Sequence, residues 1–81
     1  MSKEKKPLII DVRDAKEFEK GHAKGSINIP IGQLEDKIEE IRKQGRPIIT
    51  VCGGGTRNGR ACTLLQQHNI DTTAGGSWKK H

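Results

Sequence analysis

The chain has 81 residues, enough for one small domain. A domain of this size buries only about 60% of the surface of its unfolded chain. With one Phe, one Trp and no Tyr, its core has to be built from Ile, Leu, Val and Ala. A net charge of +5 suits anionic substrates or acidic protein partners. The scarcity of aromatic residues argues against a base-stacking surface, so we expect no nucleic-acid partner.

The histidines and cysteines do not have the spacing of a metal site. His22, His68 and His81 are scattered, and Cys52 and Cys62 are not a Cys-x-x-Cys pair, so we expect no metal and no cofactor. No apolar run approaches the roughly 18 residues of a membrane span, and no signal peptide is recognisable. We therefore expect no membrane partner, and a cytoplasmic location, with a periplasmic one after signal removal as the alternative.

The first third of the chain predicts a tail, a strand and a short helix. Residues 1–7 are expected to form a flexible basic tail, and residues 8–81 the domain. Residues 8–12 are apolar on both faces, as in a central strand of a parallel sheet. Asp14 and Glu17 have the spacing of a capping box, which predicts the start of a helix.

The remaining residues continue to alternate between strand and helix patterns. A very short strand is predicted at residues 27–29 and an amphipathic helix at residues 33–43. A β-branched run predicts a strand at residues 48–51, a helix follows at residues 56–68, and a weak strand at residues 70–74 ends before two glycines. This alternation predicts an α/β fold, with a mainly parallel sheet of four to five short strands flanked by helices.

The chain is organised around a cysteine between a strand and a helix. Cys52 ends the third predicted strand and precedes Gly53, Gly54 and Gly55. Open α/β sheets bind their ligands at this position. Glycines allow backbone N–H groups to turn inward, and the following helix adds the partial positive charge of its N-terminus. A cysteine in this place should have a lowered pKa and act as a nucleophile.

Two classes of enzyme place a cysteine in an anion-binding loop. Cysteine phosphatases separate the cysteine from an arginine by five residues, so that the guanidinium can clamp a phosphate. Cys52 and Arg57 are separated by only four residues. The shorter ring of amides favours a single added sulfur, a persulfide, and indicates sulfur transfer. A cysteine phosphatase or arsenate reductase is the less favoured alternative.

Ordered motifs over residues 8–78 resemble those of single-domain rhodaneses, the thiosulfate sulfurtransferase-like family. The motifs are Ile10-Asp11-Val12-Arg13, Glu17-Phe18, residues 21–30, the Cys-x-x-Gly-x-Arg loop of residues 52–57, and Ala74-Gly75-Gly76 with Trp78. The resemblance implies a rhodanese-like domain without cofactor. It also implies transfer of a sulfane sulfur, through a Cys52 persulfide, from thiosulfate or a persulfide donor to cyanide or a thiol.

The resemblance further assigns roles to the residues of the loop and beneath it. The substrate and the outer sulfur would be bound by the loop residues, namely Gly53, Gly54, Gly55, Thr56 and Arg57. Arg57 would attract the donor or only hydrogen-bond loop carbonyls, and Glu17 is interpreted as a capping residue. From their place at a strand end, Asp11 and Arg13 are expected to support the loop from beneath, and lining the site is the less favoured alternative. We expect a monomer, with a thioredoxin-like protein among the candidate acceptors; the alternative is a sulfur-relay or binding module for a protein partner.

Two places depart from the family pattern. Ala23 and Lys24 replace an Ile or Val followed by Pro, and Asn58 stands where the family often has Ser. We interpret these as changes in packing and at loop edges that do not touch the nucleophile. His22 is expected to be a scaffold residue bonded to the backbone, and Cys62 a packing residue.

Overall fold

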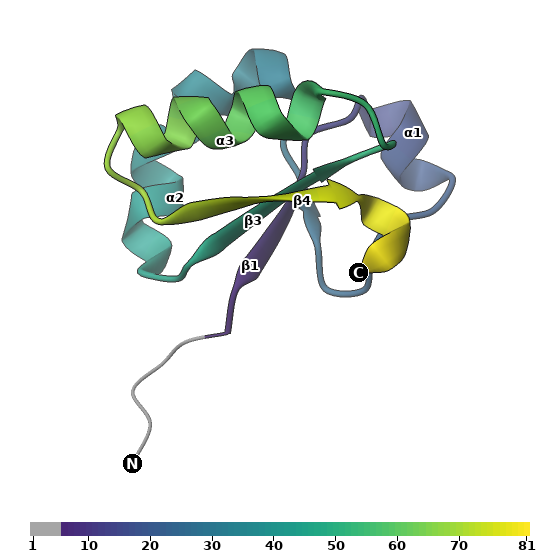
Figure 1. Ribbon diagram of the computed structural model, residues 1–81, viewed down its shortest axis with the longest axis horizontal. Coiled ribbons are helices and arrows are strands. Elements are labelled where there is room, and N and C mark those ends of the chain that lie inside the picture. Colours follow the sequence, from purple (N-terminus) through teal and green to yellow (C-terminus); the bar gives the residue numbers. More distant parts are fainter. Residues whose placement is uncertain (1–5) are drawn as a thin grey trace.

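Within residues 6–81, which the computed structural model describes, four parallel strands form one sheet (Figure 1). They are β1 (Leu8–Asp11), β2 (Ile27–Asn28), β3 (Ile48–Cys52) and β4 (Thr72–Ser77), in the order β2-β1-β3-β4. The two strands that the sequence marks as most apolar, β1 and β3, are the two central ones. The predicted α/β class and parallel sheet are confirmed.

The helices lie mainly on one face of this sheet. They are α1 (Ala15–Glu19), α2 (Ile38–Gln44) and α3 (Arg57–Gln67), with the 3₁₀ segments η1 (Ile31–Lys37) and η2 (Trp78–Lys80). Figure 1 shows α2 and α3 along the same side of the strands, with α1 close to the point where α3 begins. No helix in the described part of the chain is long and apolar enough to cross a membrane.

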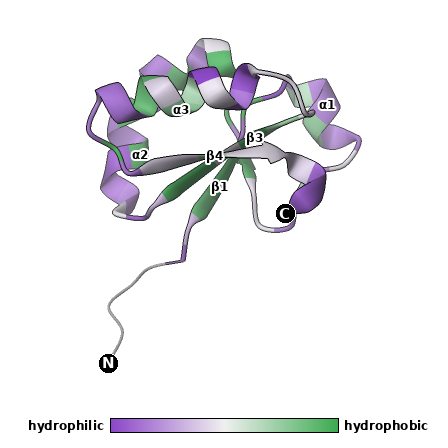
Figure 2. Ribbon diagram, viewed as in Figure 1, coloured by the Kyte–Doolittle hydropathy of each residue, from purple (hydrophilic) through white to green (hydrophobic). Residues whose placement is uncertain are grey.

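The core lies between the sheet and these helices. Figure 2 shows hydrophobic residues gathered on β1 and β3, while hydrophilic residues dominate the helices. Ile10, Leu34 and Leu65 are completely buried, and each such side chain stabilises the fold by about 1.5–3 kcal/mol. Cys52 belongs to the same buried cluster. The loop that follows Cys52 is therefore anchored directly on the core.

The segment predicted as one amphipathic helix at residues 33–43 has two parts. It begins as the 3₁₀ segment η1 and becomes α-helical only at Ile38. The junction is Lys37, whose φ of −108° and ψ of 6° lie outside the α-helical region. The predicted apolar face is nevertheless correct, since Leu34, Ile38 and Ile41 are all buried.

The last strand differs from its prediction. It spans Thr72–Ser77 and runs through the two glycines instead of ending at residue 74. Gly75 lies so close to β3 that an added Cβ would come within 2.5 Å of Ile49 Cγ2 and 3.0 Å of the Thr50 carbonyl oxygen. The missing side chain thus lets the chain stay in the sheet, and the predicted end of the strand at residue 74 is wrong.

The predicted basic tail, residues 1–7, falls largely outside the described residues. Its described part is Lys6 and Pro7, whose carbonyl oxygens accept hydrogen bonds from Arg46 at 2.8 and 3.1 Å. These bonds connect the two residues just before β1 to the turn that precedes β3.

Candidate active site

Cys52 is the last residue of β3 and lies beneath the glycine loop. Its side chain is 0% exposed, whereas Gly53, Gly54 and Gly55 are exposed. Gly54 has a φ of 114°, which residues with a side chain rarely adopt. A Cβ built on Gly54 or Gly55 meets no atom within 4 Å, so the outer side of the loop is open. At these two glycines the outer face of the loop therefore consists of backbone alone.

Polar groups of the loop and of α3 surround the sulfur. The Asn58 Nδ2 donates a hydrogen bond to Cys52 Sγ at 3.0 Å, and Sγ lies 3.6 Å from the Gly55 carbonyl oxygen. Burial by itself raises the pKa of Cys52, but the Asn58 amide and the backbone N–H groups of Gly54, Asn58 and Gly55 outweigh it and lower that pKa below its ordinary value. The thiolate, which is the nucleophilic form, is thereby favoured.

The sequence interpretation of Asn58 is wrong, because it expected no contact between this residue and the nucleophile. It is only 7% exposed, and its Nδ2 also donates to the Gly55 carbonyl at 3.0 Å. Its Oδ1 accepts from the Gly76 N–H at 3.2 Å, which fixes the orientation of the amide. A usable signal was present: Asn58 is in the first turn of α3, and helical side chains tilt toward the N-terminus, here toward the loop.

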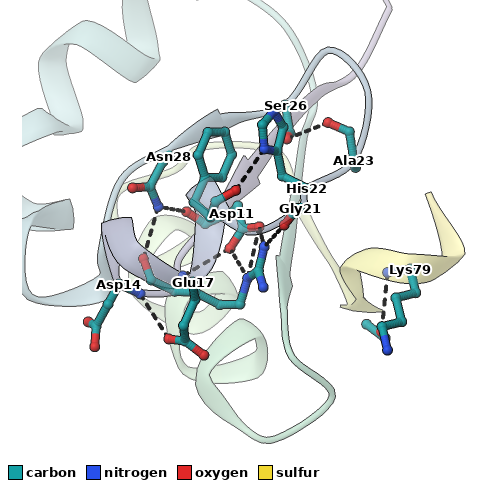
Figure 3. A network of polar contacts seen from close by, with 12 residues as sticks. Asp11, Asp14, Glu17, Gly21, His22, Ala23, Ser26, Asn28 and Lys79 are labelled. Atoms are coloured by element: carbon teal, nitrogen blue, oxygen red, sulfur yellow. Dashed lines mark hydrogen bonds and ion pairs between the residues drawn. The ribbon is translucent and has the colours of Figure 1, made fainter.

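The guanidinium of Arg57 binds the carboxylate of Glu17. Its Nη1 and Nη2 lie 3.1 and 3.3 Å from the Oε1 and Oε2 atoms of Glu17. Glu17 also accepts from the Asp14 N–H at 3.2 Å, so its capping role is present as predicted (Figure 3). Its second role, as partner of Arg57, was missed because the two residues are 40 positions apart.

The two charges of this pair reinforce each other. The hydrogen bond from Arg57 lowers the pKa of Glu17, and the same bond raises the pKa of Arg57. Both groups are therefore ionised at neutral pH. The Cys52 thiolate adds a smaller rise to the pKa of Arg57, because the guanidinium lies beside the loop. An added Cβ on Gly53 would lie 4.0 Å from Arg57 Nη2.

Asp11 and Arg13 form a buried ion pair under the loop. The Arg13 Nη2 lies 2.7 Å from Asp11 Oδ2, and the same nitrogen donates to the Gly21 carbonyl at 2.7 Å (Figure 3). The Arg13 Cδ would lie 4.0 Å from a Cβ on Gly53. The guanidinium of Arg13 also lies 4.8 Å from the centre of the Trp78 ring. The bonds of Arg13 thus go to Asp11 and to the turn after α1, and the support of the Cys52 loop by this pair stays a prediction.

The turn after α1 is held by bonds of its own. His22 Nδ1 is 2.8 Å from the Phe18 carbonyl, and the two rings stack at 3.7 Å, which matches the predicted scaffold role of His22. Asn28 Nδ2 donates to the carbonyls of Asp11 and Arg13, each at 2.9 Å. These contacts join β2 and the turn to the carboxyl end of β1.

Cys62 is chemically different from Cys52. It is buried, its Sγ donates to the Thr72 carbonyl at 3.5 Å, and burial raises the pKa of its thiol. This agrees with a packing role. Within residues 6–81, no group of three or more His, Cys, Asp or Glu side chains could hold a metal ion.

The geometry defines a class of protein: an α/β domain with a cysteine in a loop of N–H donors, at the carboxyl end of a central parallel strand. The family model of the rhodanese-like domain matches residues 1–78. The chain therefore belongs to the rhodanese-like domain family, as its motifs indicated.

Three proteins with similar sequences come from bacteria. The chain is 41% identical over 64 residues to the uncharacterized protein YqhL of Bacillus subtilis, covering 79% of this chain and 50% of YqhL. It is 32% identical over 62 residues to the putative sulfur carrier protein YrkF of the same organism, covering 76% of this chain and 33% of YrkF. It is 27% identical over 79 residues to a sulfurtransferase of Allochromatium vinosum, covering 91% of this chain and 73% of that protein.

A solved structure supports the fold. A rhodanese-related protein from Thermoplasma volcanium has a TM-score of 0.76 and 31% identity, covering 90% of this chain and 76% of that one. The chain spans half or less of the length of its two Bacillus subtilis relatives. Their names therefore describe longer proteins than the domain seen here.

Proposed function

We propose that this domain is a sulfurtransferase that carries a sulfane sulfur on Cys52, from thiosulfate or a persulfide donor to a thiophilic acceptor. The observation that carries the proposal is the sulfur of Cys52, which has a lowered pKa and is held at 3.0 Å by the Asn58 amide inside a loop of N–H donors. The similarity to a sulfurtransferase and a putative sulfur carrier supports this chemistry.

The first step forms the persulfide. The Cys52 thiolate attacks the outer sulfur of thiosulfate, a new S–S bond forms, and sulfite leaves with the electrons of the old one. The outer sulfur of the Cys52 persulfide then carries the negative charge. The N–H groups of the loop, from Gly53 to Arg57, would stabilise it as an oxyanion hole stabilises an oxygen.

The second step releases the sulfur. An acceptor, either cyanide or the thiolate of a small thiol or of a thioredoxin-like protein, attacks the outer sulfur of the persulfide. The S–S bond breaks, Cys52 returns as thiolate, and the products are thiocyanate or an acceptor persulfide. Both steps are balanced without an added oxidant or reductant. Both cysteines are free thiols, which suits a cytoplasmic location.

Turnover with cyanide tests this activity. The wild-type protein is expected to form thiocyanate from thiosulfate or a small persulfide, and Cys52→Ser to form none, because the serine hydroxyl is a poor nucleophile for sulfur. Cys62→Ser is the matched control and should keep its turnover, since Cys62 faces the core. Turnover that survives in Cys52→Ser would contradict the assignment of the nucleophile.

A sulfur-relay module is the second candidate function. The similarity to a putative sulfur carrier protein and the complete burial of Cys52 favour it. A relay module would turn over slowly with cyanide and transfer its sulfur quickly to the thiol of one protein partner. Equal and rapid transfer to any small thiol would exclude a relay.

The cysteine phosphatase alternative has less support, because the loop between Cys52 and Arg57 is one residue short. Release of product from a chromogenic phosphate ester would support a phosphatase instead of a sulfurtransferase.

A further inference from the structure

Both guanidinium groups beside the loop are already paired with carboxylates. Arg13 is bound to Asp11, and Arg57 is bound to Glu17 through two hydrogen bonds. A Cβ on Gly53 would lie 4.0 Å from Arg13 Cδ and 4.0 Å from Arg57 Nη2, so both arginine side chains pass beside the loop. Each arginine is neutralised locally. What remains to hold an anion above Cys52 is a set of neutral dipoles: loop N–H groups and the Asn58 amide.

The Glu17–Arg57 pair stands where a donor would approach the loop. The side chains of Arg57 and Glu17 are 36% and 42% exposed, whereas the Asp11–Arg13 pair is almost completely buried. A donor that uses Arg57 must first displace the Glu17 carboxylate or accept its repulsion. This cost grows with the negative charge of the donor. It is therefore larger for thiosulfate, a dianion, than for a small persulfide with at most one charge.

We propose that the Glu17–Arg57 ion pair selects the sulfur donor, disfavouring thiosulfate and favouring monoanionic or neutral small persulfides. This inference rests on the proposed sulfur transfer and names the donor class for it. In the favoured reaction the Cys52 thiolate attacks the outer sulfur of the donor R–S–SH. The S–S bond of the donor breaks, and the thiolate R–S⁻ leaves and takes up the proton, while Cys52 keeps the sulfur as its persulfide.

Glu17→Gln is the variant that isolates the charge. Glutamine at this position still supports a capping box, so α1 should form as before, while Arg57 becomes free to attract an anion. The rate of Cys52 persulfide formation is measured with thiosulfate and with the persulfide of 2-mercaptoethanol. Glu39→Gln, which removes the partner of Arg42 in an exposed ion pair of α2, is the matched control.

The expected result is a change in donor preference. In the wild type, kcat/KM should be higher for the persulfide than for thiosulfate. In Glu17→Gln, kcat/KM should rise about three- to tenfold for thiosulfate, because the half-exposed charge of Arg57 is no longer paired. For the persulfide, kcat/KM should rise by less than about twofold. The rate with thiosulfate should also become salt-sensitive in Glu17→Gln, because exposed charges are screened. Glu39→Gln should change neither rate.

Two outcomes would overturn the selection of the donor by this pair. One is a wild type that uses thiosulfate better than the persulfide. The other is a Glu17→Gln variant whose kcat/KM for thiosulfate is unchanged or lower. If neither donor forms a persulfide on the wild type, the proposed sulfur transfer itself is contradicted, and this outcome is distinct from the other two.

Discussion

At the residue scale, the reactivity of Cys52 depends on Asn58. Burial opposes the thiolate, and the largest of the opposing effects is the hydrogen bond from the Asn58 side chain. The same amide accepts from the Gly76 N–H. Asn58 therefore links the sulfur to β4 as well as to its own helix. It acts on the reaction through Cys52, as a positioning residue.

Replacing Asn58 should make the thiol less reactive at neutral pH. Asn58→Asp keeps an oxygen for the Gly76 N–H but removes the donor to the sulfur and adds a negative charge beside it. The pKa of Cys52 should rise, so alkylation by iodoacetamide at pH 7 should slow by about tenfold or more, the worth of a hydrogen bond to a charged group. The rate should recover as pH increases, because the thiolate then forms without the donor.

The full pH profile of alkylation separates this effect from a loss of structure. A chain whose loop was merely disordered would alkylate like an ordinary exposed cysteine. An Asn58→Asp profile identical to that of the wild type would contradict the role of Asn58. Its position in the first turn of the helix was visible in the sequence and placed its side chain near the loop, but the hydrogen bond to the sulfur was not, because that bond depends on how the first turn of α3 is rotated.

At the element scale, β4 shows where sequence reasoning is weakest. Two consecutive glycines normally indicate a turn, so the predicted strand ended at residue 74. In the structure, β4 continues through Gly75, where an added Cβ would lie 2.5 Å from Ile49 Cγ2 of β3. Strands β1 and β3 were predictable, because a short apolar run with β-branched residues is typical of a buried strand. The course of β4 depends on a tertiary contact that no local pattern encodes.

Gly75→Ala tests this close approach. The added methyl group would lie 2.5 Å from Ile49 Cγ2 and 3.0 Å from the Thr50 carbonyl, so β4 has to move away from β3. We expect the free energy of unfolding to fall by about 1–3 kcal/mol, as in an overpacked core. Gly32→Ala is the control, since a Cβ there meets nothing within 4 Å. Urea denaturation of both variants measures the difference, and equal stability would contradict the packing described for β4.

At the scale of the whole molecule, residues of the candidate site lie together at the carboxyl ends of the strands. Cys52 ends β3, Asp11 ends β1, and Gly76 lies near the end of β4, all at one edge of a parallel sheet. This arrangement followed from the alternation of strands and helices, and so the place of Cys52 was predictable. The pairing of Glu17 with Arg57 was not, because it joins two helices whose relative position is set only by the complete fold.

The formation of a persulfide on Cys52 tests the central claim most directly. The wild-type protein, Cys62→Ser and Cys52→Ser are each incubated with thiosulfate and, separately, with the persulfide of 2-mercaptoethanol, and their intact masses are measured. The account predicts the addition of one sulfur atom to the wild type and to Cys62→Ser, and none to Cys52→Ser. No added sulfur on the wild type with either donor, or an equal addition to Cys52→Ser, would contradict it.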